Sequence, residues 1–127
     1  MSLDNPDDSG TNISELKEQV DEYIEEREWK KYHNPKDLSF SMVIELAELM
    51  EIFQWEDQES IDKMLDDEEE LEKIKDEVAD VAIYLLSFCN TADIDLSSTV
   101  LNKIEKIKKK YPKEKVLDEE VYKKDDL

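Results

Sequence analysis

The chain is almost without the residues that tight turns between strands require. It has one glycine and three prolines in 127 residues, whereas hairpin turns depend on glycine at positive φ and on proline at fixed φ. It also lacks a glycine-rich loop of the kind that cradles phosphates. Apolar residues instead recur at the spacing of about 3.6 residues that marks a helix face. We therefore expect an all-α protein.

Capping signals and apolar spacing indicate four main helices. Asn12 followed by Glu15 is typical of a helix start, and Asp95 is expected to cap the last helix. Pro35 disfavours helix at Asn34 and predicts a break there. The expected segments are a flexible lead at 1–11, a domain at 12–112 with helices at about 12–32, 38–55, 66–92 and 95–112, an acidic connection with one or two helical turns at 57–67, and a charged, mobile tail at 113–127 with Val116, Leu117, Val121 and Tyr122 as docking points. Because apolar residues surround the axis at 38–55, we expect that helix to be largely buried.

The charge balance limits the partners. Acidic residues number 36 against 17 basic ones, a formal charge of -19, which repels a nucleic-acid polymer. No apolar run approaches the roughly 20 residues of a membrane span, and residues 1–12 lack a basic stretch followed by an apolar one. We expect a cytoplasmic protein without a nucleic-acid or membrane partner. An anionic small substrate would need divalent cations between its charges and those of the protein.

Four carboxylates lie where the helices should be apolar. Glu45 and Glu48 are three residues apart in the second helix, and Glu77 and Asp80 repeat this spacing in the third. Each pair therefore shares one helix face. Apolar residues stand one turn to either side of Glu48, and Asp80 interrupts a run of apolar or small residues. Because an ionised carboxylate buried alone is costly, this quartet needs a neutralising partner.

Three kinds of partner are open to the quartet. Protonation relieves one or two carboxylates but not four that converge. Lysine and arginine are absent from 38–55 and from 76–92. Hard divalent cations suit clustered carboxylate oxygens, so we expect Mg²⁺, with Mn²⁺ as a substitute. The alternative is a solvated acidic face, and a ferritin-like di-iron site is disfavoured because it needs two Glu-x-x-His motifs and His33 is the one histidine.

Further side chains are candidates for contacts with a ligand. Trp29 points away from the apolar stripe of its helix and is close to His33 in sequence, which suggests a subunit interface or an aromatic wall for a planar ligand. Trp55 has the same two interpretations. Tyr84 follows the third-helix carboxylates by one turn and is either a core tyrosine or a ligand contact. Lys103 belongs to a cluster of lysines that is either solvated or placed to meet phosphate oxygens.

These motifs occur in a recognisable order. They are Arg27-Glu28-Trp29, His33-Asn34-Pro35, Glu45-Leu46-Ala47-Glu48 leading to Phe53-Gln54-Trp55, Asp76-Glu77-Val78-Ala79-Asp80 with Ile83-Tyr84-Leu85, and Lys103 ahead of Tyr111-Pro112. Over about 13–112 the chain resembles the all-α nucleoside triphosphate pyrophosphohydrolases of the MazG-like kind, and most closely their dCTP pyrophosphatase branch. The resemblance implies a four-helix-bundle-like fold assembled as a dimer or tetramer, with pockets between subunits.

The resemblance also implies a reaction and a site. The reaction is hydrolysis of a (deoxy)nucleoside triphosphate, with dCTP-like pyrimidine nucleotides expected, to the monophosphate and pyrophosphate, as nucleotide-pool housecleaning. The implied residues are Glu45, Glu48, Glu77 and Asp80 as Mg²⁺ ligands, Trp29, His33 and Trp55 around the base, Tyr84 near the sugar, and Lys103 at the phosphates. We expect Glu48 also to orient or deprotonate the attacking water.

Two points stay open from the sequence. Ile107 stands where the branch commonly has asparagine, which leaves nucleotide discrimination undecided. The competing class is a non-enzymatic acidic helical bundle that binds a partner protein and keeps its carboxylates solvated.

Overall fold

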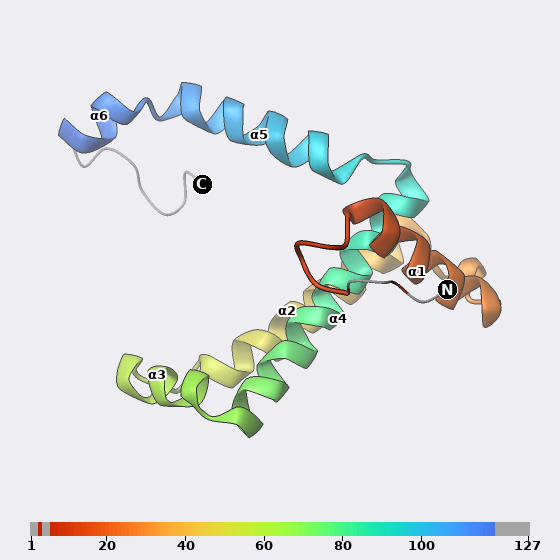
Figure 1. Ribbon diagram of the computed structural model, residues 1–127, viewed down its shortest axis with the longest axis horizontal. Coiled ribbons are helices and arrows are strands. Elements are labelled where there is room, and N and C mark those ends of the chain that lie inside the picture. The colour runs from red at the N-terminus through yellow and green to blue at the C-terminus, as the bar shows by residue number, and fades with distance from the viewer. Residues whose placement is uncertain (1–2, 4–5, 119–127) are drawn as a thin grey trace. The chain divides into compact units, whose positions relative to one another are not determined.

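The computed structural model describes residues 3 and 6–118, and over these residues every element of regular secondary structure is a helix (Figure 1). The elements are α1 (Ile13–Glu26), a 3-10 turn η1 (Lys30–Tyr32), α2 (Pro35–Phe53), α3 (Gln58–Asp66), α4 (Glu68–Ala92), α5 (Leu96–Lys110) and α6 (Lys113–Asp118). The expected all-α class is confirmed for this part of the chain. The helices fall into two compact units that divide after Asp93, and each is described by itself.

Side-chain caps set the starts of the five longer helices. Asn12 and Glu15 form a reciprocal capping box: the Asn12 side chain accepts from the Glu15 N–H at 2.9 Å, and the Glu15 carboxylate accepts from the Asn12 N–H at 3.1 Å. The same role falls to Asn34, Asp57, Asp67 and Asp95, at the starts of α2, α3, α4 and α5. These oxygens satisfy backbone donors that have no partner inside a helix. The starts expected at Asn12 and Asp95 are confirmed.

The end expected for the first helix is wrong. α1 stops at Glu26 rather than near Tyr32, because Glu28 takes the left-handed conformation at φ 53°. The Trp29 N–H then reaches back to the Ile24 carbonyl and the Glu28 N–H to the Glu25 carbonyl, both at 3.0 Å. This is the Schellman arrangement that closes a helix C-terminus, here with glutamate in the place where glycine is usual. Because no glycine stands at this position, the sequence does not reveal the turn.

The core of the first unit is organised around α4, against which α1, α2 and α3 pack. The buried apolar side chains are Val20, Ile24, Leu38, Ile74, Leu86 and Cys89. Leu38, in the first turn of α2, is 2% exposed and is the most completely buried large side chain. Pro35 occupies the first position of α2, where its missing N–H costs no hydrogen bond.

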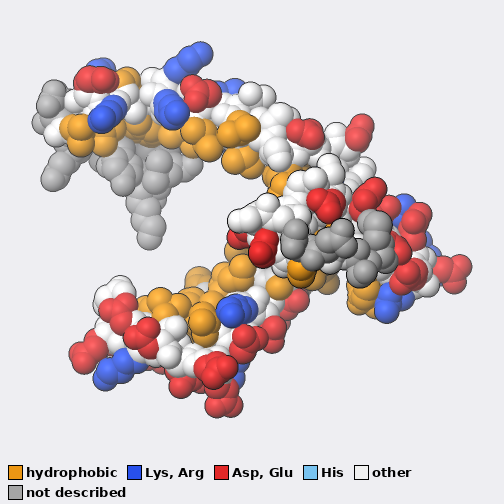
Figure 2. Space-filling model, in the orientation of Figure 1, with side chains coloured by type: hydrophobic (Ala, Val, Ile, Leu, Met, Phe, Trp, Pro, Cys, Tyr) orange, Lys and Arg blue, Asp and Glu red, His pale blue; other side chains and the backbone are white. Residues whose placement is uncertain are grey.

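The expectation that the second helix is largely buried is wrong for the single chain. Leu38 is the one buried residue of α2, and much of its remaining apolar surface is exposed at Phe40, Val43, Ile44, Leu46 and Met50. The physical reason is that α4 covers one side of α2, whereas apolar side chains surround the helix. Figure 2 shows hydrophobic side chains open to view over the α2 and α3 part of the first unit.

The second unit consists of α5 and α6. α5 begins after Asp95 and ends at Lys110, just before Pro112, which is close to the expected limits. Residues 113–118 of the expected charged tail form the helix α6, whereas Val121 and Tyr122 lie outside the described residues. The domain limits expected at 12 and 112 stay predictions. No helix in the described part of the chain combines the length and apolarity needed to cross a membrane.

Leu38→Ala is expected to lower the free energy of unfolding by about 2–5 kcal/mol, because it leaves a cavity at the most buried position of α2. Urea unfolding followed by circular dichroism measures this change. Leu117→Ala, at a side chain that is 73% exposed, is the control and should change stability by less than about 0.5 kcal/mol. Equal effects of the two substitutions would contradict the packing described.

Candidate metal centre

Three carboxylates meet where α2 packs against α4. Glu45 and Glu48 come from successive turns of α2, and Glu77 comes from α4. One oxygen from each lies within 4.8 Å of the others. Glu45 and Glu77 are half-buried and Glu48 is exposed. The spacing of three residues puts the two α2 carboxylates on one helix face, and the helix packing adds the third.

Asp80 lies beside this trio. It is half-buried, and its charge raises the pKa of both Glu45 and Glu77. The structure therefore places all four expected carboxylates in one neighbourhood, with three of them close enough to share an ion. The role of Asp80 as a fourth ligand stays a prediction.

The electrostatics of the trio are those of crowded anions, two of which are partly withdrawn from water. Burial raises the pKa of Glu45, and the hydrogen bond and the charge of Glu48 raise it further. Burial likewise raises the pKa of Glu77, followed by the charge and the hydrogen bond of Glu48 and by the charges of Asp80 and Asp76. Each shift records a cost of holding the ionised form in this place.

Two of the carboxylate oxygens are buried without a partner. Among the described residues, Oε2 of Glu45 and Oε2 of Glu77 are each occluded from solvent and accept no hydrogen bond. A buried acceptor without a donor is costly, and a cation is the partner that also cancels the crowded charge. The donor set consists of oxygens alone, which fits Mg²⁺ or Mn²⁺ and not a thiolate- or imidazole-bound metal.

His33 lies against α4 and apart from the carboxylate set. Its Nδ1 is 3.0 Å from the Ser87 hydroxyl oxygen, and its ring stacks on Tyr84 at 6.5 Å between centroids. The structure thus brings together two of the residues expected at the nucleotide. Ser87 was not singled out from the sequence, although a polar residue three positions after Tyr84 in an apolar run is the signal that would have found it.

The two tryptophans are not brought to this pair within the single chain. Trp29 follows the left-handed turn that ends α1 and packs edge-on against Tyr23, at 5.7 Å between ring centroids. Because this turn comes before it, Trp29 lies outside α1 and does not belong to the apolar stripe of that helix. Trp55 follows α2 and is 87% exposed. Their expected places around a base stay predictions.

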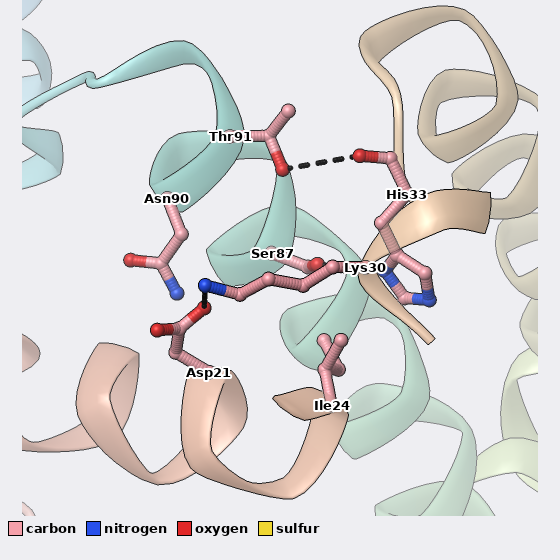
Figure 3. A pocket seen from close by; sticks show the side chains of 7 residues that line it. All are labelled: Asp21, Ile24, Lys30, His33, Ser87, Asn90 and Thr91. Carbon is pink, nitrogen blue, oxygen red and sulfur yellow. Dashed lines mark hydrogen bonds and ion pairs between the residues drawn. The ribbon is translucent and has the colours of Figure 1, made fainter. Parts of the chain in front are cut away.

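A polar pocket of about 240 Å³ lies beside His33 (Figure 3). Its lining residues are Asp21, Ile24, Lys30, His33, Ser87, Asn90 and Thr91. Lys30 crosses it to Asp21 at 3.4 Å, and the same ammonium is 3.0 Å from Glu25. The hydrogen bond to Glu25 is the main cause of the raised pKa of Lys30. None of the trio carboxylates lines this pocket.

Lys103 belongs to α5 in the second unit, where it is exposed. Its expected contact with phosphate oxygens stays a prediction.

Comparison with known proteins adds three findings. A profile of the MazG-like family matches residues 40–125. The proteins named dCTP pyrophosphatase 1 from Bos taurus and from Homo sapiens are each 32% identical to this chain over 91 residues, which are 72% of this chain and 54% of theirs. The chain thus spans about half the length of these curated relatives. The crystal structure of a pyrophosphatase from Archaeoglobus fulgidus matches with a TM-score of 0.73 and 41% identity, over 80% of this chain and 93% of that one.

Glu77→Gln is expected to stabilise the metal-free protein at neutral pH and to reduce its stabilisation by Mg²⁺. Because the pKa of Glu77 is raised above the ordinary 4.5, the folded state holds its proton more tightly than the unfolded state. The resulting penalty is present above the raised pKa and disappears as the pH falls toward 4.5. Wild-type stability should therefore increase on acidification through this window, and the variant should gain less.

Thermal unfolding in EDTA and in Mg²⁺, across this pH range, measures both effects. Glu18→Gln removes an exposed carboxylate of α1 and controls for the change in net charge. A Glu77→Gln variant that is less stable than wild type in EDTA, or that keeps the full response to Mg²⁺, would contradict the description of the trio as a cation site.

Proposed function

The chain belongs to the MazG-like family, and on that premise we propose that it is a metal-dependent hydrolase that converts nucleoside triphosphates to the monophosphate and pyrophosphate. The observation that carries the proposal is the meeting of three carboxylates from two helices with two buried oxygens that have no hydrogen-bond donor. An acidic bundle that merely binds a protein has no need for such a cluster. The net charge of -19 supports a small, metal-complexed anion as the partner rather than a nucleic-acid polymer.

Glu45, Glu48 and Glu77, with Asp80 beside them, are the residues proposed to hold the ion. Mg²⁺, or Mn²⁺ in its place, supplies charge neutralisation of the triphosphate and polarisation of the phosphorus under attack. Glu45 and Glu77 each have one occluded oxygen that accepts no hydrogen bond, so these two side chains are suited to ligation.

Glu48 is proposed to be the catalytic residue. It is the exposed member of the trio, so its carboxylate is within reach of a water molecule that arrives with the substrate. One of its oxygens lies within 4.8 Å of an oxygen of each other member, and its hydrogen bond and charge raise the pKa of Glu45 and that of Glu77. A carboxylate in this position orients a water molecule and accepts its proton as the water attacks.

dCTP-like pyrimidine nucleotides are the proposed substrates. The proposal draws on the curated relatives named dCTP pyrophosphatase 1 and on the stacking of His33 with Tyr84 one turn beyond Asp80. Trp29, His33 and Trp55 are proposed to contact the base, Tyr84 the sugar and Lys103 the phosphates. The cytoplasmic address expected from the sequence stays a prediction.

A homodimer or homotetramer is the proposed working form. Support comes from α2, where side chains such as Phe40, Val43 and Met50 are more exposed than apolar residues of a finished core usually are. A second copy would cover them, and pockets between copies would bring further aromatic side chains to the ligand.

Glu48→Gln is expected to lower kcat by at least about 100-fold, since general-base groups contribute roughly two to four orders of magnitude. The helical circular dichroism spectrum should be unchanged. The measurement is release of pyrophosphate from a panel of single nucleotides, with Mg²⁺ and with EDTA. Glu59→Gln, at an exposed carboxylate of α3, is the control and should keep wild-type activity. If the wild type with Mg²⁺ releases no pyrophosphate from any nucleotide, the enzymatic function is ruled out, and the alternative of an acidic helical bundle that binds a partner protein is retained.

Val43→Glu is expected to dissociate the assembly. Val43 is 63% exposed in the single chain, and a charge buried in an apolar interface is costly. Light scattering should give a wild-type mass of two or four times 15.0 kDa and a smaller mass for the variant. Leu117→Glu, in α6, is the control and should leave the mass unchanged. A wild-type mass of one chain would contradict the proposal.

A further inference from the structure

One face of α4 holds His33 at three points. The His33 ring stacks on Tyr84, its Nδ1 is 3.0 Å from the Ser87 hydroxyl, and its carbonyl accepts a hydrogen bond of 3.4 Å from the Thr91 hydroxyl. Tyr84, Ser87 and Thr91 are three and four residues apart, so they share one helix face. In Figure 3 the Ser87 side chain extends from α4 toward the His33 ring.

The backbone of His33 is held as firmly as its ring. The His33 N–H donates to the Lys30 carbonyl at 3.0 Å, and the next residue, Asn34, caps α2. Because the N–H and the carbonyl of His33 are both hydrogen-bonded, its side chain can change position only by rotation about its own bonds. Ser87 and Tyr84 restrict that rotation.

We propose that Ser87 is a positioning residue that fixes the His33 ring with Nε2–H outward, where it donates a hydrogen bond to an oxygen acceptor of the bound nucleotide. This inference rests on the function proposed above.

The direction of the Ser87–His33 hydrogen bond follows from burial. Ser87 is 3% exposed. Among the described residues, the hydrogen-bond partner of the Ser87 hydroxyl is His33. A hydroxyl that accepted from Nδ1–H would leave its own hydrogen buried without an acceptor, which is costly. The hydroxyl therefore donates, and Nδ1 accepts.

The neighbouring cation does not compete for His33. Lys30 lines the same pocket, but its ammonium lies 3.4 Å from the Asp21 carboxylate and 3.0 Å from that of Glu25. It is thereby held toward α1, and Ser87 remains the partner of Nδ1. A neutral imidazole with Nδ1 occupied carries its proton on Nε2 and presents that nitrogen as a donor. The matching chemistry on a nucleotide is a carbonyl oxygen of the base or a phosphate oxygen.

Nitrogen NMR of the imidazole tests the hydrogen bond without any substrate. His33 is the one histidine, so its ring signals need no residue assignment, and their couplings to the carbon-bound ring hydrogens distinguish Nδ1 from Nε2. In mildly alkaline buffer, where an imidazole is neutral, the wild type should show a pyrrole-type Nε2 and a pyridine-type Nδ1 shifted by an accepted hydrogen bond. Ser87→Ala should move Nδ1 to the position of a pyridine-type nitrogen without a donor, and Ser87→Thr should keep the wild-type shift.

A pyrrole-type Nδ1 in the wild type, or an unchanged Nδ1 shift in Ser87→Ala, would overturn the proposal. If Ser87→Ala does not fold, Ser87→Thr and the wild type still decide the tautomer and the donor.

Kinetics test the consequence for the nucleotide. Ser87→Ala should raise KM for dCTP about threefold to tenfold, the range that one neutral hydrogen bond supports, with a smaller change in kcat. Cys89→Ala is the matched control, because it removes one heavy atom from a residue of the same helix that is 2% exposed. It should leave KM unchanged.

A double-mutant cycle separates positioning from a general loss of packing. In a His33→Ala background, Ser87→Ala should raise KM by less than about twofold, because residues that act through one contact are not additive. If Ser87→Ala raises KM equally in the wild-type and the His33→Ala backgrounds, the proposal is overturned.

A comparison of two nucleotides identifies the acceptor. If Ser87→Ala raises KM for dCTP but not for dATP, whose base has no carbonyl, the acceptor is on the base. If KM rises equally for both nucleotides, the acceptor is on the phosphates.

Failure of the proposed function has a different signature. A wild-type protein that releases no pyrophosphate overturns that function and the nucleotide part of this inference, whereas the nitrogen shifts decide the Ser87–His33 hydrogen bond in either case.

Discussion

The repulsion among carboxylates at the contact between α2 and α4 is the constraint on which the site depends. Glu45, Glu48 and Glu77 lie within 4.8 Å of one another through one oxygen each, and the pKa values of Glu45 and Glu77 are both raised. An arrangement that opposes folding persists because other contacts hold the helices together, among them the buried side chains Leu38 and Leu86. A divalent cation held by these carboxylates, as proposed, would remove that opposition, and its binding would add to the free energy of unfolding.

The left-handed turn at Glu28 has a comparable influence on the aromatic residues. Because it ends α1 early, residues 29–33 leave the helix path, and His33 is carried to the C-terminal half of α4. The turn thus connects a local backbone event to the position of the imidazole that we propose contacts the nucleotide.

The exposed side chains of α2 connect the fold with assembly. A helix with apolar residues all around its axis needs more than one neighbour, and within the first unit α4 is the helix that packs along it. The carboxylates lie on the side that α4 covers, so one chain supplies the whole candidate ion site. The uncovered residues, such as Val43, are exposed in the single chain. In the proposed function, metal binding and assembly therefore use different sides of the same helix.

Local signals in the sequence were enough for the helical class, for the caps at Asn12 and Asp95, and for the pairing of Glu45 with Glu48, because each depends on residues three or four positions apart. They failed at Glu28, where a non-glycine residue takes a left-handed conformation, and for the burial of α2, because burial depends on how many neighbours a helix finds. Only the tertiary structure decided that Glu77 meets the α2 pair and that Ser87 meets His33, 54 residues away in sequence. Helix starts are set by backbone groups bonded to nearby side chains, whereas the meeting of distant side chains is set by the packing of whole helices, which no single segment specifies.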